Sequence, residues 1–529
     1  MYEPDMQLAA TAVETAKKIV ASAIVEMKNS GIDANQVVAY DLAHAASGVE
    51  AAKAMITYGA NGAIEARLAC AFIAEVAGDL VSRAFGRESL WGINENQLET
   101  LHDFVRRFRD PNYVSSLANQ MGPTHLDVDF ELVRDTFRKF AQDQIAPLAD
   151  EIHRKNLDVP ESIISGLGEM GAFGLSIPEE YGGFSTGNEN DYLAMVIATE
   201  ELSRCSLASG GSLITRPEIL ARALLRGGTQ AQKEYWLPKL ASGEIMAAVA
   251  VTEPDYGSDV AGLTTSAVRT EGGWLLNGVK TWCTFGARAD VLMVLARTDP
   301  DRSKAHRGLS LFIVPKPHGD SGGFLFEQAS ADGAPAKMEG RPIDTIGYRG
   351  MHSYEIAIEN WFVANENLVG EDSGLGRGFY YQMEGFENGR IQTAARAVGI
   401  MQAAYESAVV YAQNRKVFGA PIIDYQLSQY KLGKMAAIIQ ASRQLAYQVC
   451  ILMAKGEGAL EASMVKAYVC RAAEWVTREA MQIHGGMGYA EEFPVSRLFL
   501  DARVLSIFEG ADETLSLKVI ARKLIDSIS

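Results

Sequence analysis

The hydrophobic pattern of the first hundred residues has the spacing of helices. From about residue 5 to 112, apolar positions recur every three or four residues, as in "AIEARLACAFIAEVAGDLVSRAF". A polar stretch, "NQMGPTHLDVD", then interrupts the pattern, and its adjacent glycine and proline favour a linker. Helical spacing resumes in "FELVRDTFRKFAQDQIAPLADEIHRK" and continues to "AQKEYWLPKLASGE". We therefore predict an N-terminal helical extension over residues 1–121 and an α-helical domain over residues 125–246.

After residue 246 the pattern changes to the alternation of strands. "WLLNGVKTW" places Asn277 and Gly278 between apolar residues, and this pair is typical of a tight hairpin turn because both residues tolerate positive φ. Further strands are predicted in "DVLMVLART", "LSLFIVPK" and "YEIAIENWFV", and helical spacing returns from "GLGRGFYYQMEGFENGR" onward. The pattern predicts a mainly α protein with a small antiparallel β domain over residues 247–368 and a C-terminal helical bundle over residues 369–529.

One glycine-rich stretch matches a nucleotide-binding spacing without its context. "GLGEMG", residues 166–171, has the glycine spacing of the dinucleotide fingerprint. That fingerprint follows a strand and opens a helix, whereas the residues before it here, "PESIISGL", have helical spacing. We read the stretch as a helix end and a turn.

Composition and charge exclude several classes of protein. The 529 residues are 48% hydrophobic, and no stretch is long and apolar enough to span a bilayer. Lys and Arg number 49 against 66 Asp and Glu, and the net charge of -17 disfavours nonspecific binding to nucleic acid or anionic membranes. The cysteines lie far apart without metal-ligand spacing, so we expect neither a disulfide framework nor a metal site. The opening residues lack a basic segment followed by an apolar run, and we expect a cytoplasmic protein.

One acid among apolar neighbours stands out near the C-terminus. In "SIFEGADE", Glu509 follows Ile507 and Phe508 and precedes a glycine. An exposed turn explains such an acid. A general base beside a substrate explains it equally, because partial desolvation raises the affinity of a carboxylate for protons.

Four other stretches suit a bound cofactor, although each has an ordinary structural explanation. "AVTEPDYGSD" offers hydroxyls and backbone N–H groups to a phosphate or a polar ring edge, or forms a capped turn. "KTWCTF" places Trp282 and Thr284 on one face of a strand, where they cover a planar ring or complete a core. "RKVFG" ends a helix with two cations that also satisfy its dipole. "QIHGGMGYAEEFPVSRLFLDA" has glycines that permit close approach of a pyrophosphate, and His484 within it is equally a structural histidine.

In their order and spacing, "AVTEPDYGSD", "KTWCTF", "RKVFG", "QIHGGMGYAEEFPVSRLFLD" and "IFEGADE" resemble the acyl-CoA dehydrogenase family over roughly residues 125–525. The resemblance implies an α-helical domain, a β domain and a C-terminal helical bundle. It implies FAD as the cofactor, an acyl-CoA thioester as the substrate and an electron-transferring flavoprotein as the electron acceptor. It also implies a homo-oligomer, a dimer or a tetramer, with FAD bound between subunits. The implied reaction removes hydrogens from Cα and Cβ of the thioester.

The resemblance also implies site residues. Glu509 corresponds to the base that takes the α proton while the β hydrogen leaves as hydride to flavin N5. Arg390 in "FENGR" corresponds to a position that holds the CoA moiety, and Ser258 to a hydroxyl between flavin and pantetheine. The resemblance implies FAD contacts from Val251, Thr252, Ser258, Trp282, Thr284, Arg415, Gln426, Gln482, Gly485, Gly486 and Glu513. Those from Arg415 to Gly486 come from a neighbouring subunit.

Three positions depart from the family pattern. Tyr256, Phe508 and Ala511 stand where a small residue, a tyrosine and a hydroxyl-bearing residue are usual. They affect the expected acyl-pocket shape and one flavin contact, and leave the reaction class unchanged.

The extension and four segments resemble one branch of the family, which oxidises a short acyl-CoA with an α-methyl branch and a distal carboxylate. The segments are "GGSLITRPEIL", "VKTWCTFGARADVL", "RPIDTIGYRGMHSYE" and "MEGFENGRIQTAARA". Because a buried carboxylate needs a cation or several donors, Arg216 in "LITRPEI" is our candidate for binding it. An exposed arginine at a helix end explains Arg216 equally. We expect the extension to cap the acyl-binding domains or to mediate assembly.

Other functions fit the same residues. A different short branched or dicarboxylic acyl-CoA dehydrogenase is one, and an oxidase that passes electrons to O2 is another. A catalytically silent assembly protein on the same fold fits less well, because the chain retains Glu509 and the flavin segments.

Overall fold

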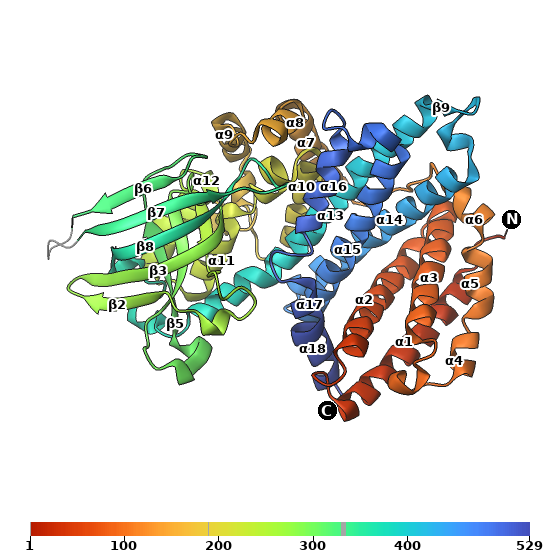
Figure 1. Cartoon of the computed structure of the whole chain (residues 1–529), viewed down its shortest axis with the longest axis horizontal. Coiled ribbons are helices and arrows are strands. Elements are labelled where there is room, and N and C mark those ends of the chain that lie inside the picture. Colours follow the sequence, from red (N-terminus) through yellow and green to blue (C-terminus); the bar gives the residue numbers. More distant parts are fainter. Residues whose placement is uncertain (1, 189, 330–334, 529) are drawn as a thin grey trace. The chain divides into compact units, whose positions relative to one another are not determined.

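The structure is a computed structural model that describes residues 2–188, 190–329 and 335–528. The chain forms two compact units: the first combines Met1–Phe137 with Arg390–Ser529, and the second is Arg138–Gly389 (Figure 1). Two helices contribute residues to both units: α7 (Val128–Phe140) and α13 (Gly378–Asn414).

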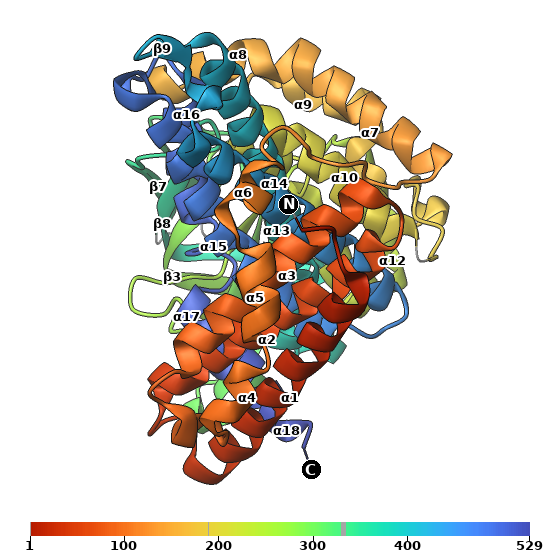
Figure 2. The same cartoon turned by 90° about the vertical axis from the view of Figure 1, so that its right-hand side faces the viewer.

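The N-terminal extension is helical, as predicted, and forms part of the first unit. Asp5 caps its first helix by accepting a hydrogen bond from the Leu8 N–H at 2.9 Å. Small buried residues such as Ala39, Ala43 and Ala69 let the helices approach one another closely. The helices, which lie side by side in Figures 1 and 2, are α1 (Met6–Ser30), α2 (Gln36–Gly59), α3 (Ala63–Ala84), α4 (Glu95–Glu99), α5 (His102–Phe108) and α6 (Pro111–Ser115).

The C-terminal part of the first unit is also helical. Its elements are α14 (Gln426–Ala454), α15 (Ala459–Ile483), α16 (Pro494–Val504), α17 (Asp512–Thr514), the π-helical η12 (Leu515–Ile520) and α18 (Ala521–Asp526). Helix α2 packs against α14, α15 and η12, while α6 packs against α14. The extension therefore covers the C-terminal helices of its own unit.

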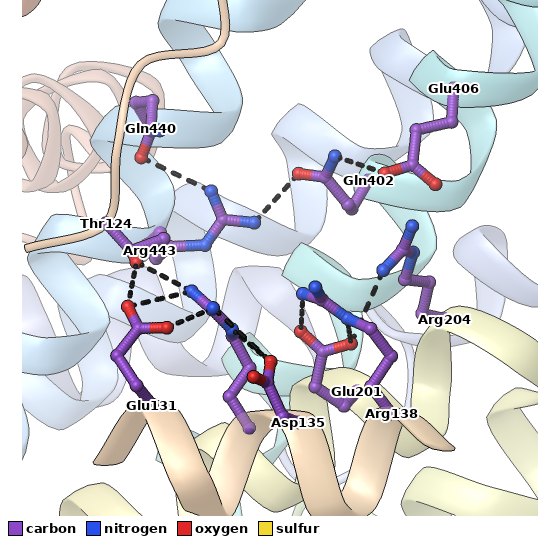
Figure 3. Close-up of polar contacts among 11 residues, drawn as sticks. Thr124, Glu131, Asp135, Arg138, Glu201, Arg204, Gln402, Glu406, Gln440 and Arg443 are labelled. Atoms are coloured by element: carbon purple, nitrogen blue, oxygen red, sulfur yellow. Dashed lines mark hydrogen bonds and ion pairs between the residues drawn. The ribbon is translucent and has the colours of Figure 1, made fainter. Parts of the chain in front are cut away.

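Polar contacts fix the predicted linker to the first unit, and Figure 3 shows those of Thr124. Gln440 Nε2 in α14 donates to the carbonyl oxygens of Met121 and Gly122 at 2.6 and 2.9 Å. Arg134 Nη1 in α7 donates to Thr124 Oγ1 at 3.2 Å. The linker is thus hydrogen-bonded to both α14 and α7.

The α-helices that lie wholly in the second unit precede its sheet in sequence, whereas the start of α13 follows it. They are α8 (Ala146–Lys155), α9 (Glu161–Glu169), α10 (Asn190–Cys205), α11 (Arg216–Gly227) and α12 (Gln230–Ser242). "GLGEMG" ends α9, and Gly171 takes the left-handed conformation at φ 71°. The prediction of a helix end and turn there is confirmed.

Among the described residues of the second unit, eight strands form one mainly antiparallel sheet (Figure 1). The strands are β1 (Ala247–Ala250), β2 (Ser266–Thr270), β3 (Gly273–Thr284), β4 (Val291–Arg297), β5 (Leu309–Pro315), β6 (Phe324–Gln328), β7 (Ala336–Ile343) and β8 (Ser353–Ala364). Their order is β1-β4-β2-β3-β8-β7-β6, with β5 paired to β4. The sheet is not wholly antiparallel, because β1 and β4 pair in parallel.

The hairpin turn predicted at Asn277 and Gly278 is wrong. Strand β3 runs through both residues, and the chain turns instead at Gly272, which has φ 73°. Asn277 Oδ1 accepts a hydrogen bond from the Asn360 N–H at 2.8 Å. A Cβ on Gly278 would lie 2.4 Å from Thr265 Oγ1, so this glycine permits a close approach at a bulge between β3 and β8.

The sequence predicts no disulfide framework, no metal site and no membrane-spanning segment. All five cysteines are free thiols. No group of His, Cys, Asp and Glu side chains in the described ranges is suited to a metal ion. Of the helices in those ranges, none combines the length and apolarity needed to cross a membrane.

Candidate active site

Glu509 lies in the loop between α16 and α17, in the left-handed conformation at φ 53°. Its Oε1 accepts a hydrogen bond from Arg396 Nη1 at 2.9 Å, and its Oε2 accepts one from Thr393 Oγ1 at 2.6 Å. Both donors come from α13, one helical turn apart. A positive charge and two hydrogen bonds favour the ionised carboxylate, which is the form that a general base requires.

The apolar shielding expected around Glu509 is only partly present. Ile507 is 54% exposed in the chain. The ring of Phe508 lies near a charged group, because the guanidinium carbon of Arg396 is 5.8 Å from its centre. The fully buried guanidinium of Arg396 therefore places a positive charge beside Glu509.

The backbone on both sides of Glu509 is anchored. Lys466 in α15 is 1% exposed, and its Nζ donates to the carbonyl oxygens of Phe508 at 2.8 Å and Gly510 at 2.5 Å. The Asp512 N–H donates to the Ser506 carbonyl at 3.1 Å and closes the loop at its base. These contacts offset the cost of a left-handed conformation for a residue with a side chain.

A cavity of about 690 Å³ borders the same loop within the first unit. Its lining includes Tyr40, Arg471, Trp475, Arg503 and Glu513, and the last of these is a predicted FAD contact. Aromatic rings line part of it, and its three arginines are matched by three acids, Glu474, Asp512 and Glu513.

The second unit carries one set of predicted flavin contacts on adjacent segments. The Thr281 N–H donates to the Thr252 carbonyl at 2.8 Å and joins the loop after β1 to strand β3. Trp282 is 56% exposed at φ 57°, whereas Cys283 beside it is buried. Thr284 is half-buried, with its Oγ1 3.0 Å from Ser353 Oγ. The indole and the hydroxyls are available to a planar ring and its polar edge, so these residues fit a flavin. Two further predicted contacts lie in the loop after β1. Val251 is buried and Ser258 is exposed.

A buried ion pair that the sequence analysis missed supports this loop. Lys280 Nζ lies 2.9 Å from Glu253 Oε1, with the two side chains 0% and 3% exposed, and also donates to the Val251 carbonyl at 3.0 Å. Glu253 further accepts hydrogen bonds from the backbone N–H groups of Thr264 and Thr265 at 2.7 and 2.8 Å. Although burial raises it, Lys280 and these hydrogen bonds lower the pKa of Glu253 to about 2. The available signal was that Lys280 is the one charged residue of strand β3.

The remaining predicted FAD contacts lie at exposed positions of the first unit. Arg415 follows α13, and Gln426 begins α14 and donates from Nε2 to Asn112 Oδ1 at 2.8 Å. Gln482 is exposed at the end of α15. A Cβ on Gly485 or Gly486 would meet nothing within 4 Å, so both leave room for a ligand.

His484, between these contacts, is a structural histidine. Its Nδ1 lies 2.8 Å from the Ala480 carbonyl oxygen and its Nε2 lies 3.1 Å from Ser407 Oγ. Its ring stacks on Tyr411 at a centroid distance of 4.3 Å. Two apolar residues that lie close in sequence to the predicted FAD contacts are strongly exposed: Phe418 is 98% and Tyr489 is 85% exposed.

The two arginines predicted to bind substrate lie in different units. Arg390 in the first unit donates from Nη1 to Ser463 Oγ at 3.1 Å. Arg216 in the second unit begins α11, is 6% exposed and donates from Nε to the Ser212 carbonyl at 3.1 Å. The alternative of an exposed Arg216 is therefore wrong. Among the described residues, no carboxylate forms an ion pair with its guanidinium.

Family models match three consecutive parts of the chain. The acyl-CoA dehydrogenase N-terminal domain matches residues 128–244, the middle domain residues 248–361 and the C-terminal domain residues 376–525. The extension lies outside all three matches.

Individual relatives agree with these matches. A (2S)-methylsuccinyl-CoA dehydrogenase of Cereibacter sphaeroides is 44% identical over 407 residues, which cover 77% of this chain and 71% of the relative. A mitochondrial 2-methylacyl-CoA dehydrogenase of Solanum tuberosum is 36% identical over 75% of this chain and 91% of its own. Among solved structures, butyryl-CoA dehydrogenase from Megasphaera elsdenii superposes with a TM-score of 0.68 at 31% identity, covering 76% of this chain and 100% of that one. A glutaryl-CoA dehydrogenase in complex with glutaryl-CoA also has a TM-score of 0.68 at 31% identity, with 76% and 97% covered.

Proposed function

The chain belongs to the acyl-CoA dehydrogenase family, and we propose that it oxidises (2S)-methylsuccinyl-CoA to mesaconyl-CoA, a step of the ethylmalonyl-CoA pathway. Membership makes it an FAD-dependent oxidoreductase that acts on CH–CH bonds of acyl-CoA thioesters. The narrower substrate is supported by 44% identity to the Cereibacter sphaeroides enzyme.

The observation that supports a distal carboxylate on the substrate is the state of Arg216. A guanidinium that is 94% buried without an ionic partner among the described residues costs free energy, because burial removes its hydration. A substrate carboxylate at the end opposite the thioester would supply the missing counter-charge and accept its hydrogen bonds. Methylsuccinyl-CoA has this carboxylate, whereas isobutyryl-CoA and butyryl-CoA lack it.

Glu509 is the proposed base for the α proton. Arg396 and Thr393 hold its carboxylate ionised, and the anchored loop fixes the direction in which it points. The backbone N–H of Glu509 is our candidate for donating to the thioester carbonyl, where negative charge develops as the proton leaves. FAD, when bound, supplies the acceptor for the β hydrogen as hydride.

We assign the FAD contacts to two sets of residues. Val251, Thr252, Ser258, Trp282 and Thr284 would hold the flavin ring, because Trp282 and Thr284 offer an exposed indole and a hydroxyl two positions apart at the end of β3. The adenosine part would contact Arg415, Gln426, Gln482, Gly485, Gly486 and Glu513.

The exposed side chains beside the second set favour a homo-oligomer, a dimer or a tetramer. Phe418 and Tyr489 are large apolar residues left almost fully exposed in the single chain, as is typical of a surface that a partner covers. In this proposal Arg390 holds the CoA moiety, an electron-transferring flavoprotein accepts the electrons, and the enzyme is cytoplasmic.

The test is anaerobic bleaching of the flavin in the purified, FAD-loaded enzyme. We expect methylsuccinyl-CoA to bleach it faster than isobutyryl-, glutaryl- or butyryl-CoA, and preference for butyryl-CoA would overturn the narrower substrate. Glu509→Gln should retain FAD and lose bleaching with every thioester, so bleaching at the parental rate contradicts its role as base. Slow reoxidation of the bleached enzyme in air is expected of a dehydrogenase, and fast reoxidation would identify an oxidase.

A further inference from the structure

Two residues of the N-terminal extension reach the segment that follows Glu509. The Tyr40 hydroxyl donates to Asp512 Oδ2 at 2.5 Å, and His44 Nε2 lies 3.1 Å from the same oxygen. Tyr40 and His44 stand four residues apart on α2, so both side chains face one side of the helix, and their rings contact edge to face at 4.6 Å. The Asp512 carboxylate thus joins α2 to the start of α17.

These contacts are buried and polar. His44 is 6% and Asp512 is 7% exposed. Burial lowers the pKa of His44 against the opposing effect of Asp512, which favours the neutral ring, and its Nε2–H tautomer donates to the Asp512 carboxylate. Burial and the Asp512 hydrogen bond raise the pKa of Tyr40 to about 12, which keeps its hydroxyl a donor.

Asp512 lies close enough to Glu509 along the chain to affect its position. Its N–H closes the loop by donating to the Ser506 carbonyl at 3.1 Å, and it stands three positions after Glu509, a reach of about 10 Å at most. Its other oxygen, Oδ1, is buried and has no hydrogen-bond partner among the described residues. Tyr40 and His44 therefore supply the hydrogen bonds by which the described structure orients this carboxylate.

The chain beyond Asp512 is held by the same helix. Segment η12 packs against α2, and Ser516 Oγ within it lies 3.3 Å from His44 Nε2. His44 is thus near polar atoms both at the base of the catalytic loop and in the helical segment that follows it. Hydrogen bonds are directional, so these contacts specify an orientation that apolar packing alone would leave free.

We propose that Tyr40 and His44 are positioning residues for the catalytic base: through Asp512, the N-terminal extension sets the orientation of the loop that presents Glu509. This inference rests on the proposed function of Glu509. It gives the extension, which the family models do not cover, a part in proton abstraction in addition to packing.

The test uses the full-length, FAD-loaded enzyme and measures the rate constant of flavin reduction, the substrate Kd and the melting temperature. The variants are Tyr40→Phe, His44→Leu and His44→Gln, with Glu509→Gln measured beside them. The matched control is Tyr58→Phe, which removes a tyrosine hydroxyl from the same helix. That hydroxyl donates to the Pro123 carbonyl at 3.0 Å, away from the catalytic loop.

We expect Tyr40→Phe and His44→Leu to lower the rate constant about tenfold, because small misplacements of a reacting group are costly, while Kd changes less than about twofold. His44→Gln should recover most of the rate, since its amide can donate to Asp512 from a similar position. Tyr58→Phe should lower the melting temperature without changing the rate constant.

Parental rate constants in Tyr40→Phe and His44→Leu would overturn the inference, and so would equal rates in His44→Leu and His44→Gln. If His44→Leu does not fold, Tyr40→Phe decides, because it removes a single oxygen. An inactive Glu509→Gln beside a fully active Tyr40→Phe defeats only this inference. A fully active Glu509→Gln defeats the proposed base itself.

Discussion

Arg396 Nη1 lies 2.9 Å from Glu509 Oε1, and the arginine is completely buried. The candidate base is thus held by a fixed positive charge from α13. Removing one partner of a buried pair leaves the other charge uncompensated.

We expect Arg396→Gln to lower the rate constant of flavin reduction about a hundredfold, because Glu509 loses its counter-charge and one of its hydrogen bonds. Arg396→Lys keeps the positive charge and should lower this rate constant less. Stopped-flow reduction under anaerobic conditions measures both, with FAD content checked by absorbance. Equal rates in the parent and in Arg396→Gln would remove Arg396 from the site.

Lys466 should support both activity and stability. Lys466→Met leaves the carbonyl oxygens of Phe508 and Gly510 without the ammonium, so we expect a loss of about 2–4 kcal/mol in the free energy of unfolding and slower flavin reduction. Lys518→Met is the control, because Lys518 is 56% exposed and pairs with Asp33 at 3.4 Å, and such surface pairs are worth about 0–1 kcal/mol. Urea unfolding compares the two variants, and equal losses would contradict the anchoring role.

Glu253 predicts how stability depends on pH. Its pKa in the folded chain is about 2, below the usual 4.5, so the stabilisation is fully present above pH 4.5 and is lost as the pH falls towards 2. The shift corresponds to about 3 kcal/mol at neutral pH. Glu253→Gln should lower the free energy of unfolding by this amount at pH 7. Between pH 5 and about 2.5 the free energy of unfolding of this variant should fall less steeply than that of the parent, as measured by urea unfolding. A variant that declines as steeply as the parent would assign the acid sensitivity to other groups.

Arg216 should decide substrate preference. We expect Arg216→Met to lower kcat/KM for methylsuccinyl-CoA by about 10²–10³, because a desolvated carboxylate would lose its charged partner. Oxidation of isobutyryl-CoA, which has no distal carboxylate, should change only a few-fold. Steady-state kinetics with both thioesters test this, and a parallel loss with the two substrates would assign Arg216 a structural role.

Two glycines in helices should respond oppositely to the same substitution. A Cβ on Gly433 in α14 would lie 2.0 Å from the Val114 carbonyl oxygen, so Gly433→Ala must separate α14 from α6 and should cost about 1–3 kcal/mol. A Cβ on Gly48 in α2 would lie 3.4 Å from a Val76 methyl, an ordinary contact. Gly48→Ala should therefore stabilise the chain by about 0.5–1 kcal/mol through helix propensity. Thermal unfolding compares them, and a stabilised Gly433→Ala would contradict the close packing.

The sequence by itself determined the order of helical and β segments, because burial of one face imposes a period of 3.6 or 2 residues wherever an element forms. It also singled out Glu509, Trp282 and Thr284, since each lies in a short segment whose local pattern carries the information. Local signals failed where a neighbour decided the outcome. Asn277 and Gly278 have the composition of a turn, yet β3 continues through both residues. Neighbours distant in sequence decide this: Asn277 bonds to Asn360, and Thr265 lies so close that only a glycine fits at position 278.

Only the tertiary structure decided how the candidate base is held. Arg396 is 113 residues from Glu509 in sequence, and Tyr40 is 472 residues from Asp512. A single charged or aromatic residue in a helical pattern carries no signal for a partner at that separation. Hydrogen bonds and ion pairs act over about 3–4 Å, so which of the chain's many donors meets which acid is set by the packing of α2, α13 and α15 around one loop.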